Sequence, residues 1–282
     1  MLFKQVYLWQ SINSIVNLDF FKKKDLVEPL SPEIDEVVMV VNLKKSFFLK
    51  DKEVAALKNI SFSVRKGEFF VIKGASGSGK TTLLNILGAM ETTTSGRVAI
   101  NGKTLDLLSE KQLTLLRRLE IATIYQSYNL IPVLNAFQNV ELPLMLSGLK
   151  EEERLLRTKK LLKLVGLEER MEHIPEELSG GEQQRVAIAR SLSNKPNIIF
   201  ADEPTGNLDE EIQIKIMKIL EGINRDLGTT IIMVTHDLKL AERADRILEL
   251  KNGEILEIRE GKDKDKRIKD LEKVEAKDPS FY

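Results

Sequence analysis

The chain of 282 residues contains no cysteine, which excludes disulfides and cysteine-ligated metal sites and makes a reducing cytosol its natural compartment. It also lacks any run of about 18 apolar residues, so no segment is predicted to span a bilayer. If the protein works at a membrane, another chain supplies the span. The chain has no net charge either, because lysine plus arginine and aspartate plus glutamate both number 43. No overall field therefore favours nucleic acid or an anionic membrane as a partner.

A glycine-rich stretch is the most specific feature that is present. It has the spacing G-x-x-x-x-G-K-[ST] and consists of Gly74, Ala75, Ser76, Gly77, Ser78, Gly79, Lys80 and Thr81. The apolar run Phe69–Ile72 precedes it and apolar residues at helical spacing follow it, which is the context of a phosphate-binding loop rather than of a merely flexible turn. Backbone N–H groups and the positive end of the following helix would bind phosphate oxygens. Lys80 adds a charge for the β- and γ-phosphates, and Thr81 offers a hydroxyl to Mg²⁺.

Short apolar runs predict the strands of two sheets. Val37–Val41, Ile60–Val64 and Arg97–Ile100 favour an antiparallel layer, and the last is followed by an Asn-Gly turn typical of a hairpin. Runs that are apolar on both faces predict a sheet covered by helices on each side. These runs are Ile121–Tyr125, Asn197–Ala201 and Thr229–Val234. Glu254–Ile258 is expected to be the last strand.

The stretch between Gln126 and Pro196 is predicted to be a helical insertion between two strands of the sheet. Its clearest helix, Glu151–Val165, carries leucines among abundant charges and is followed by a glycine. Two further helices, Glu211–Leu227 and Asp237–Ala244, are expected to return the chain to the sheet.

The two ends of the chain are predicted to lie outside the compact domain. Residues 1–36 form an extension and linker, in which one side of a helix would be apolar, with Leu2, Val6, Trp9, Ile12, Val16 and Phe20. Such a segment suits a membrane surface or a partner, and a helix packed on its own domain or a disordered segment fits equally well. Residues 259–282 are almost wholly charged with both signs interleaved, which is typical of a solvated tail.

A strand that ends in two carboxylates supplies candidate acid–base residues. Asp202 and Glu203 follow the apolar run Ile198–Ala201, and neighbours at a strand end point in different directions. We expect Asp202 to hold the Mg²⁺ shell opposite Thr81. We expect Glu203 to orient and deprotonate a water for in-line attack on the γ-phosphorus. A plain turn and helix N-cap is the alternative, because Pro204 follows.

A second glycine pair opens a later helix. The spacing of Ser179 and Glu182 predicts a capping box at this helix start. Gly180 and Gly181 lie between them, although glycine costs roughly 1 kcal/mol against alanine inside a helix. The pair is explained if the helix start approaches another backbone or an anion closely.

Taken in chain order, these motifs resemble an ABC-type ATPase. They are the phosphate loop, Gln126 after a strand, the LSGGE helix start, the Asp-Glu strand end, the run from Gly206 to Asp209, and the Thr-His-Asp run around His236. The likeness covers roughly residues 37–258, and LSGG is its specific element. It implies an α/β fold of the P-loop NTPase class. The expected parts are a RecA-like core with a mainly parallel sheet covered by helices, an antiparallel β subdomain, and an α-helical subdomain at about residues 127–193.

The resemblance also implies roles for single residues within one copy. ATP is expected to be bound by the loop from Gly74 to Thr81, by Thr82, and by Phe47 at the place of an adenine-stacking Tyr. The implied catalytic residues are Glu203, His236, Gln126 and Lys80, and the implied Mg²⁺ ligands are Thr81, Gln126 and Asp202. A purely structural histidine is the alternative interpretation of His236.

A second copy is expected to complete each site. The resemblance implies a head-to-tail dimer that holds two ATP molecules between its copies. The residues expected to reach the partner's nucleotide are Ser179, Gly180, Gly181, Glu182 and Asp209. Glu182 departs from the commoner Gln but preserves the helix cap.

The runs after Gln126 and around Asp202 look like those of lipoprotein-release, macrolide-export (MacB-like) and cell-division ATPases, together with antimicrobial-peptide resistance systems. The likeness implies a cytoplasmic ATPase subunit, peripheral on the inner face of the cell membrane, that drives a separate integral membrane permease. A regulator of a membrane partner in cell-wall or division signalling is the alternative. The apolar residues after Gln126 fit the permease's coupling helix and the core of the helical subdomain equally. No nucleic acid is expected as a partner, because the chain has neither a long coiled-coil insertion nor tandem ATPase domains.

Overall fold

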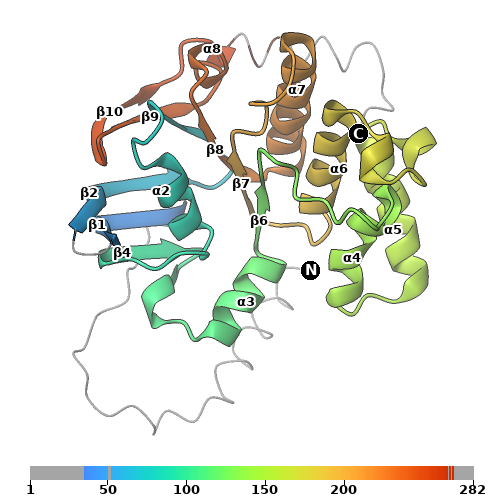
Figure 1. Cartoon of the computed structure of the whole chain (residues 1–282), viewed down its shortest axis with the longest axis horizontal. Helices are drawn as coiled ribbons and strands as arrows, with labels where there is room; N and C mark the ends of the chain where they lie inside the picture. Colours follow the sequence, from blue (N-terminus) through green and yellow to red (C-terminus); the bar gives the residue numbers. More distant parts are fainter. Residues whose placement is uncertain (1–34, 50–51, 266, 268, 270–282) are drawn as a thin grey trace, which may run out of the picture.

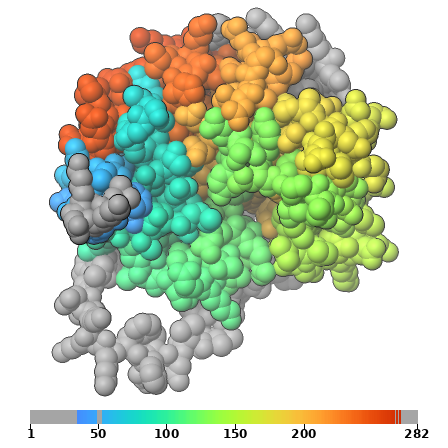
Figure 2. All heavy atoms as spheres, viewed as in Figure 1, coloured from blue at the N-terminus to red at the C-terminus, as the bar shows by residue number. Residues whose placement is uncertain are grey.

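The computed structural model describes residues 35–49, 52–265, 267 and 269. In this part of the chain, two β-sheets and a group of helices are arranged side by side (Figure 1). The space-filling view shows the helical part from α4 to α6, in yellow and yellow-green, as a lobe opposite the blue and cyan β part (Figure 2). The predicted extension over residues 1–34 and the end of the predicted tail lie outside the described residues.

The larger sheet has six strands in the order β10-β9-β3-β8-β7-β6. Their bounds are β3 (Phe69–Lys73), β6 (Ile121–Ile124), β7 (Ile198–Asp202), β8 (Thr230–Thr235), β9 (Arg246–Lys251) and β10 (Glu254–Glu260). All neighbours pair in parallel except β9 and β10, which form an antiparallel hairpin. The mainly parallel sheet that the sequence predicts is therefore confirmed.

Each central strand of this sheet is buried on both faces. Along β3, Phe69 and Val71 join the hydrophobic cluster under the later helices, whereas Phe70 and Ile72 join the cluster under α2 and the smaller sheet. All four side chains are fully buried. Burying each such side chain contributes about 1.5–3 kcal/mol to stability. Strands that are apolar on both faces therefore pack the layers on either side of the sheet together.

The smaller sheet has four antiparallel strands in the order β2-β1-β4-β5. Their bounds are β1 (Glu36–Leu49), β2 (Lys52–Arg65), β4 (Ser95–Ile100) and β5 (Lys103–Thr104). The Asn-Gly turn predicted after Ile100 is present, because β4 and β5 pair across Asn101 and Gly102 with φ of 49° and 74°.

The helices flank the larger sheet or extend from it (Figure 1). Their bounds are α2 (Lys80–Leu87), α3 (Glu110–Leu119), α4 (Ala136–Leu146), α5 (Glu151–Leu164), α6 (Gly180–Ser191), α7 (Glu210–Leu227) and α8 (Leu238–Ala241), with short 3₁₀ turns η1 (Leu105–Leu107), η2 (Glu168–Arg170) and η3 (Pro175–Glu177). The helices α4 to α6 lie between β6 and β7 in the sequence, where the helical insertion is predicted. Asparagine and serine caps begin α4 and α6, each with a reciprocal capping box.

Two elements, α3 and β9, have no counterpart in the sequence prediction. In addition, β10 runs to Glu260, beyond the expected domain boundary at residue 258, and the chain after it packs on the core. Arg267 is only 7 % exposed, donates to Asp245 at 2.7 Å and lies over the ring of Phe69. The first part of the charged C-terminal segment therefore contacts the domain instead of being wholly solvated.

Candidate functional site

The phosphate loop joins β3 to α2, and its glycines hold positions that a larger residue cannot take. A Cβ on Gly74 would lie 2.3 Å from the carbonyl oxygen of Leu250, and one on Gly79 would lie 2.6 Å from that of Ala56. Gly77 and Gly79 have φ of 76° and 102°, in the left-handed region that other residues rarely adopt. The tight curl needed to surround an anion is thus built into the backbone.

The phosphate loop carries a lysine that is held close to its backbone. Lys80 is 6 % exposed and its Nζ donates to the carbonyl oxygen of Ala75 at 2.9 Å. The backbone N–H of Ser78 donates to the same oxygen at 3.2 Å. Ala75 and Ser76 are exposed, and Thr82 is half-buried in the first turn of α2. A full charge and the positive end of a helix therefore meet in one loop, which suits phosphate oxygens.

Asp202, at the carboxyl end of β7, faces the start of α2. The hydroxyl of Thr81 donates to its Oδ1 over a long 3.4 Å. Burial raises the pKa of Asp202, and the neighbouring Glu203 raises it further, while Thr81 and Lys80 act in the opposite direction. The Thr81 hydroxyl and the Asp202 carboxylate are therefore chemically suited to bind a small cation, because the negative charge of Asp202 is only partly compensated.

Glu203 follows directly and faces the residue after β8. Its Oε2 lies 2.7 Å from Nδ1 of His236, and its side chain is 19 % exposed against 63 % for the imidazole. The backbone of Glu203 has a φ of 44°, a left-handed conformation that is uncommon for a non-glycine residue, and its N–H donates to the carbonyl oxygen of Val234 at 3.0 Å. The strained backbone turns the second carboxylate away from the first and toward the imidazole.

Gln126, just after β6, is held from the loop that follows β7. Its Nε2 donates to Oδ1 of Asn207, and Nδ2 of Asn207 donates back to the carbonyl oxygen of Gln126, both at 3.2 Å. A Cβ on Gly206 would lie 2.8 Å from Gln126 Nε2 and 3.3 Å from Glu203 Oε2. Gly206 and Asn207 therefore hold the Gln126 amide close to the Glu203 carboxylate. Sequence reasoning assigned neither residue a role, and glycine at the third place after Glu203 was the available signal.

The helix start at Ser179 forms the predicted capping box, which is confirmed. The Ser179 hydroxyl accepts from the Glu182 N–H at 3.3 Å, and the Ser179 hydroxyl and N–H both lie within 2.9 Å of Glu182 Oε2. These bonds lower the pKa of Glu182, and Arg170 lies 3.4 Å from the other carboxylate oxygen. The Glu182 carboxylate is thus kept ionised, and the nearby Arg170 partly balances its negative charge.

The glycine pair in this helix is explained first by contacts within the chain. A Cβ on Gly180 would lie 2.8 Å from the Tyr128 hydroxyl, and one on Gly181 would lie 2.7 Å from Cγ2 of Ile212. Within one copy, the helix start therefore approaches side chains closely, whereas the predicted approach to another backbone or an anion stays a prediction. An anion from another copy is not needed to explain either glycine.

The other predicted site residues lie apart from the phosphate loop or have local roles. Asp209 is the N-cap of α7 and accepts from the N–H of Ile212 at 3.0 Å. Phe47 lies near the end of β1, 36 % exposed, with Lys45 Nζ 4.9 Å from the centre of its ring. Figure 1 shows α6, whose start carries Ser179, on the far side of β6 and β7 from α2. The structure thus brings together the residues after β3, β6, β7 and β8, but not the LSGG helix start.

This arrangement defines an NTPase of the P-loop class, because a phosphate loop, two carboxylates, an amide and an imidazole all follow strands of one mainly parallel sheet. The chain belongs to the ABC transporter family, whose family model matches residues 57–206. It is therefore an ATP-binding subunit of this transporter family and hydrolyses ATP.

Relatives of known sequence match most of this chain. The uncharacterized ABC transporter ATP-binding protein MJ1508 of Methanocaldococcus jannaschii is 48% identical over 217 residues, which cover 77% of this chain and 96% of the relative. YbbA of Escherichia coli K12 is 46% identical over 223 residues, which cover 79% of this chain and 98% of YbbA. The macrolide export ATP-binding/permease protein MacB of Bartonella henselae is 45% identical, but the match covers only 34% of MacB.

A solved structure shows the same fold. The dimeric post-hydrolysis state of the ATP-binding cassette MJ0796, bound to ADP and Pi, superposes with a TM-score of 0.75 at 42% identity, over 79% of this chain and 98% of that one. Within the described residues of the present chain, no helix is long and apolar enough to cross a membrane.

Proposed function

We propose that the residues gathered at the carboxyl ends of β3, β6, β7 and β8 carry out ATP hydrolysis, and that two copies of the chain form each complete site. The observation that supports this most is the pair of neighbouring contacts at the end of β7. Asp202 lies against Thr81 of the phosphate loop, whereas Glu203 lies against His236. Two adjacent carboxylates with different partners are suited to two different tasks.

The first task is to hold Mg²⁺ beside the phosphates. Thr81 and Asp202 supply a hydroxyl and a carboxylate oxygen, the hard ligands that this ion prefers, and the Gln126 amide is the third proposed ligand. No cluster of three or more His, Cys, Asp or Glu side chains suits a metal within the described residues. The cation would thus take most of its ligands from phosphate and water, and its charge would stabilise the phosphoryl group under attack.

The second task is to activate the attacking water. Glu203 contacts the His236 imidazole and, like the Gln126 amide, lies beside Gly206. We propose that these three side chains hold one water for attack on the γ-phosphate. The carboxylate accepts a proton from this water while the imidazole holds the carboxylate in place and contacts the γ-phosphate. Lys80 stabilises the charge that develops on the phosphate oxygens.

The second copy supplies the LSGG helix start. In one chain this helix start and the phosphate loop belong to different parts of the molecule, and the related cassette MJ0796 is dimeric in its ADP and Pi state. We propose that Ser179 and Gly181 of one copy approach the γ-phosphate bound by the other. Asp209 would reach the opposite phosphate loop from its N-cap position at α7.

The membrane partner is proposed to bind a groove between α3 and α4. This groove has a volume of about 250 Å³ and is lined by Arg117, Arg118, Ile121, Ala122, Thr123, Ile131, Asn139, Leu142, Pro143, Leu146, Arg190, Ser191, Asn194 and Pro196. Val133, in the loop before α4, is 83 % exposed, whereas Leu130 and Phe137 pack against the core. Part of the apolar run after Gln126 therefore belongs to the core, and part of it lies at the surface. An exposed apolar groove with a basic rim suits the coupling helix of a permease on the inner face of the cell membrane. The likeness to MacB supports an export-type permease.

The proposal is tested with Glu203→Gln. The amide cannot accept the proton of water, so we expect the turnover rate to fall about a hundredfold or more, the range that general-base catalysis contributes. ATP binding should remain, because the phosphate loop is untouched, and the variant should accumulate as an ATP-bound dimer. Steady-state phosphate release and light scattering with ATP measure both.

Glu211→Gln is the matched control, because Glu211 is an exposed residue on α7 that pairs only locally with Lys215. It should hydrolyse ATP at the normal rate. If Glu203→Gln also did so, Glu203 would not be the base.

A further inference from the structure

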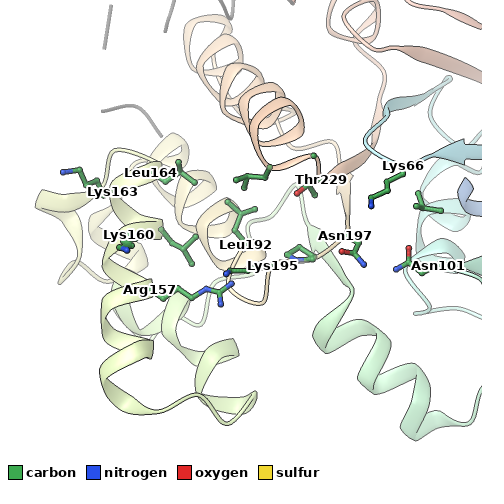
Figure 3. Close-up of a pocket in the computed structure, with 15 residues that line it drawn as sticks. Lys66, Asn101, Arg157, Lys160, Lys163, Leu164, Leu192, Lys195, Asn197 and Thr229 are labelled. Atoms are coloured by element: carbon green, nitrogen blue, oxygen red, sulfur yellow. The ribbon is translucent and has the colours of Figure 1, made fainter. Parts of the chain in front are cut away.

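A second cavity lies at the opposite edge of the larger sheet from the nucleotide site. It has a volume of about 1080 Å³ and is lined by the residues that precede β3, β7 and β8, by the first residues of β1, and by one side of α5. Figure 3 shows Arg157 and Lys160 on the α5 wall and Lys66, Asn101 and Asn197 on the wall formed by the sheet. We call this cavity the basic groove. The ATPase mechanism assigns it no role.

The charged residues that line the basic groove are all positive. Its charged lining residues are Lys66, Arg157, Lys160, Lys163 and Lys195, and no acidic side chain is among the described residues that line it. Only Lys163 forms an ion pair there, with Glu168 at 3.4 Å, among the salt bridges of the described part of the chain. Burial lowers the pKa of Arg157, while the nearby Glu153 carboxylate acts in the opposite direction. Cations on two facing walls, with no acidic side chain among the described lining residues, favour an anionic occupant.

The groove is also apolar between these charges. Leu161 and Leu164 of α5, Leu192 after α6 and Leu227 of α7 line it, and Leu227 is 59 % exposed. A small inorganic anion would leave these leucines in contact with water. The occupant that fits both features is a chain segment that alternates acidic and apolar side chains.

We propose that the basic groove binds residues 25–34 of the same chain. The first described residues are hydrogen-bonded at its rim, because the Lys66 N–H donates to the carbonyl oxygen of Asp35 at 2.7 Å and the Asn101 N–H donates to that of Val37 at 2.8 Å. Lys66, Asn101 and Val37 all line the groove. The segment that precedes Asp35 therefore starts from the groove itself, and ten residues reach at most about 36 Å.

The composition of this segment matches the groove. Asp25, Glu28 and Glu33 are acidic, and they alternate with the apolar residues Leu26, Val27, Leu30 and Ile34. Between Lys24 and Lys44 the chain has no basic residue at all. Acidic side chains bind the lysines of the two walls, and apolar ones cover the leucines between them. Because one wall is α5 and the other is the edge of the sheet, the bound segment bridges the helical part and the core.

Hydrogen exchange of the full-length chain tests this proposal. Binding should slow amide exchange in the peptide covering residues 25–36 by at least about tenfold relative to its exchange in denaturant. Charge reversal on both walls with Lys66→Glu plus Lys160→Glu should abolish this protection. Adding Glu28→Lys plus Glu33→Lys to that variant should restore it. Thermal melting checks that each variant is folded, and a rate of ATP hydrolysis within about twofold of the unmodified chain is expected, since neither lysine is at the nucleotide site.

The control variant is Lys111→Glu plus Lys159→Glu, which reverses two exposed lysines outside the groove, one of them next to Lys160 on α5. It should keep the protection. Exchange at the denatured rate in the unmodified chain, or protection that survives the reversal of Lys66 and Lys160, would contradict the proposal. The proposal is also wrong if that reversal weakens binding to phosphatidylserine vesicles without changing exchange, because the groove would then bind lipid headgroups.

Discussion

At the scale of single residues, Gly206 shows how closely the catalytic side chains are packed. Its missing Cβ leaves the space in which the Gln126 amide lies close to the Glu203 carboxylate. Asn207 then fixes that amide with a reciprocal pair of hydrogen bonds. The loop after β7 is therefore a positioning element for a residue that follows β6.

Gly206→Ala should impair catalysis without unfolding the protein. The new methyl group would displace the end of the Gln126 side chain, which is flexible, so the backbone can stay in place. We expect the turnover rate to fall at least about tenfold, equivalent to about 1.4 kcal/mol in the activation free energy. The melting temperature should change little. A large loss of melting temperature with normal turnover would show that Gly206 serves the fold and not the site.

The sequence located most site residues but not their contacts. The spacing around Lys80 and Thr81 and the Asp-Glu strand end predicted positions that the structure brings together. The pairing of Gln126 with Asn207 was not predictable, because it joins residues 81 positions apart through side chains of no special sequence pattern. The left-handed backbone of Glu203 was not predictable either, since tertiary contacts impose it against local preference.

At the scale of elements, hydrogen bonds to Glu242 hold the C-terminal hairpin and the turn after it against the rest of the domain. Arg259 donates to its carboxylate at 2.9 Å, the Lys262 N–H donates at 3.1 Å, and the Asp263 N–H donates to its carbonyl oxygen at 2.8 Å. The hydrogen bonds from Arg259 are the main reason that the pKa of Glu242 falls from 4.5 to about 2. The charged C-terminal segment is thereby held to the core next to α8.

This lowered pKa predicts a pH-dependent contribution to stability. A carboxylate whose pKa is lower in the folded than in the unfolded state stabilises the fold fully above about pH 4.5, and the contribution disappears as the pH falls toward 2. Glu242→Gln should therefore melt below the unmodified chain at pH 7, and the difference should shrink as the pH falls below about 4.5. Thermal melts of both chains from pH 7 to pH 3 test this. A difference that stays constant with pH would rule out the ionised pair as its cause.

The elements that were predicted correctly are those with a strong local sequence pattern. Strands buried on both faces and the long amphipathic α7 were found because their side chains repeat a clear pattern. The strand β9 was missed because charged residues interrupt it. Arg246 forms an ion pair with Glu68, and Glu249 forms one with Lys73. Both partners lie outside β9. Tertiary ion pairs allow such residues in a sheet, and one sequence does not show them.

At the scale of the whole molecule, the central claim is that one chain holds only half of each hydrolytic site. The phosphate loop, Asp202, Glu203 and His236 meet at one edge of the sheet, whereas the LSGG helix start lies in the helical part. The glycines of that helix start are explained by contacts within the chain, so they neither require nor oppose a second copy. Only a measurement on the assembled protein can therefore distinguish a complete monomeric site from a shared one.

That measurement is the rate of ATP hydrolysis per chain as a function of protein concentration, with the state of association followed by light scattering. If two copies form the site, the rate per chain should rise with concentration and reach a plateau where the ATP-bound dimer is saturated. ATP binding by dilute monomers should persist, since the phosphate loop is complete in one copy. A rate per chain that stays constant at concentrations where the protein is monomeric would contradict the shared site.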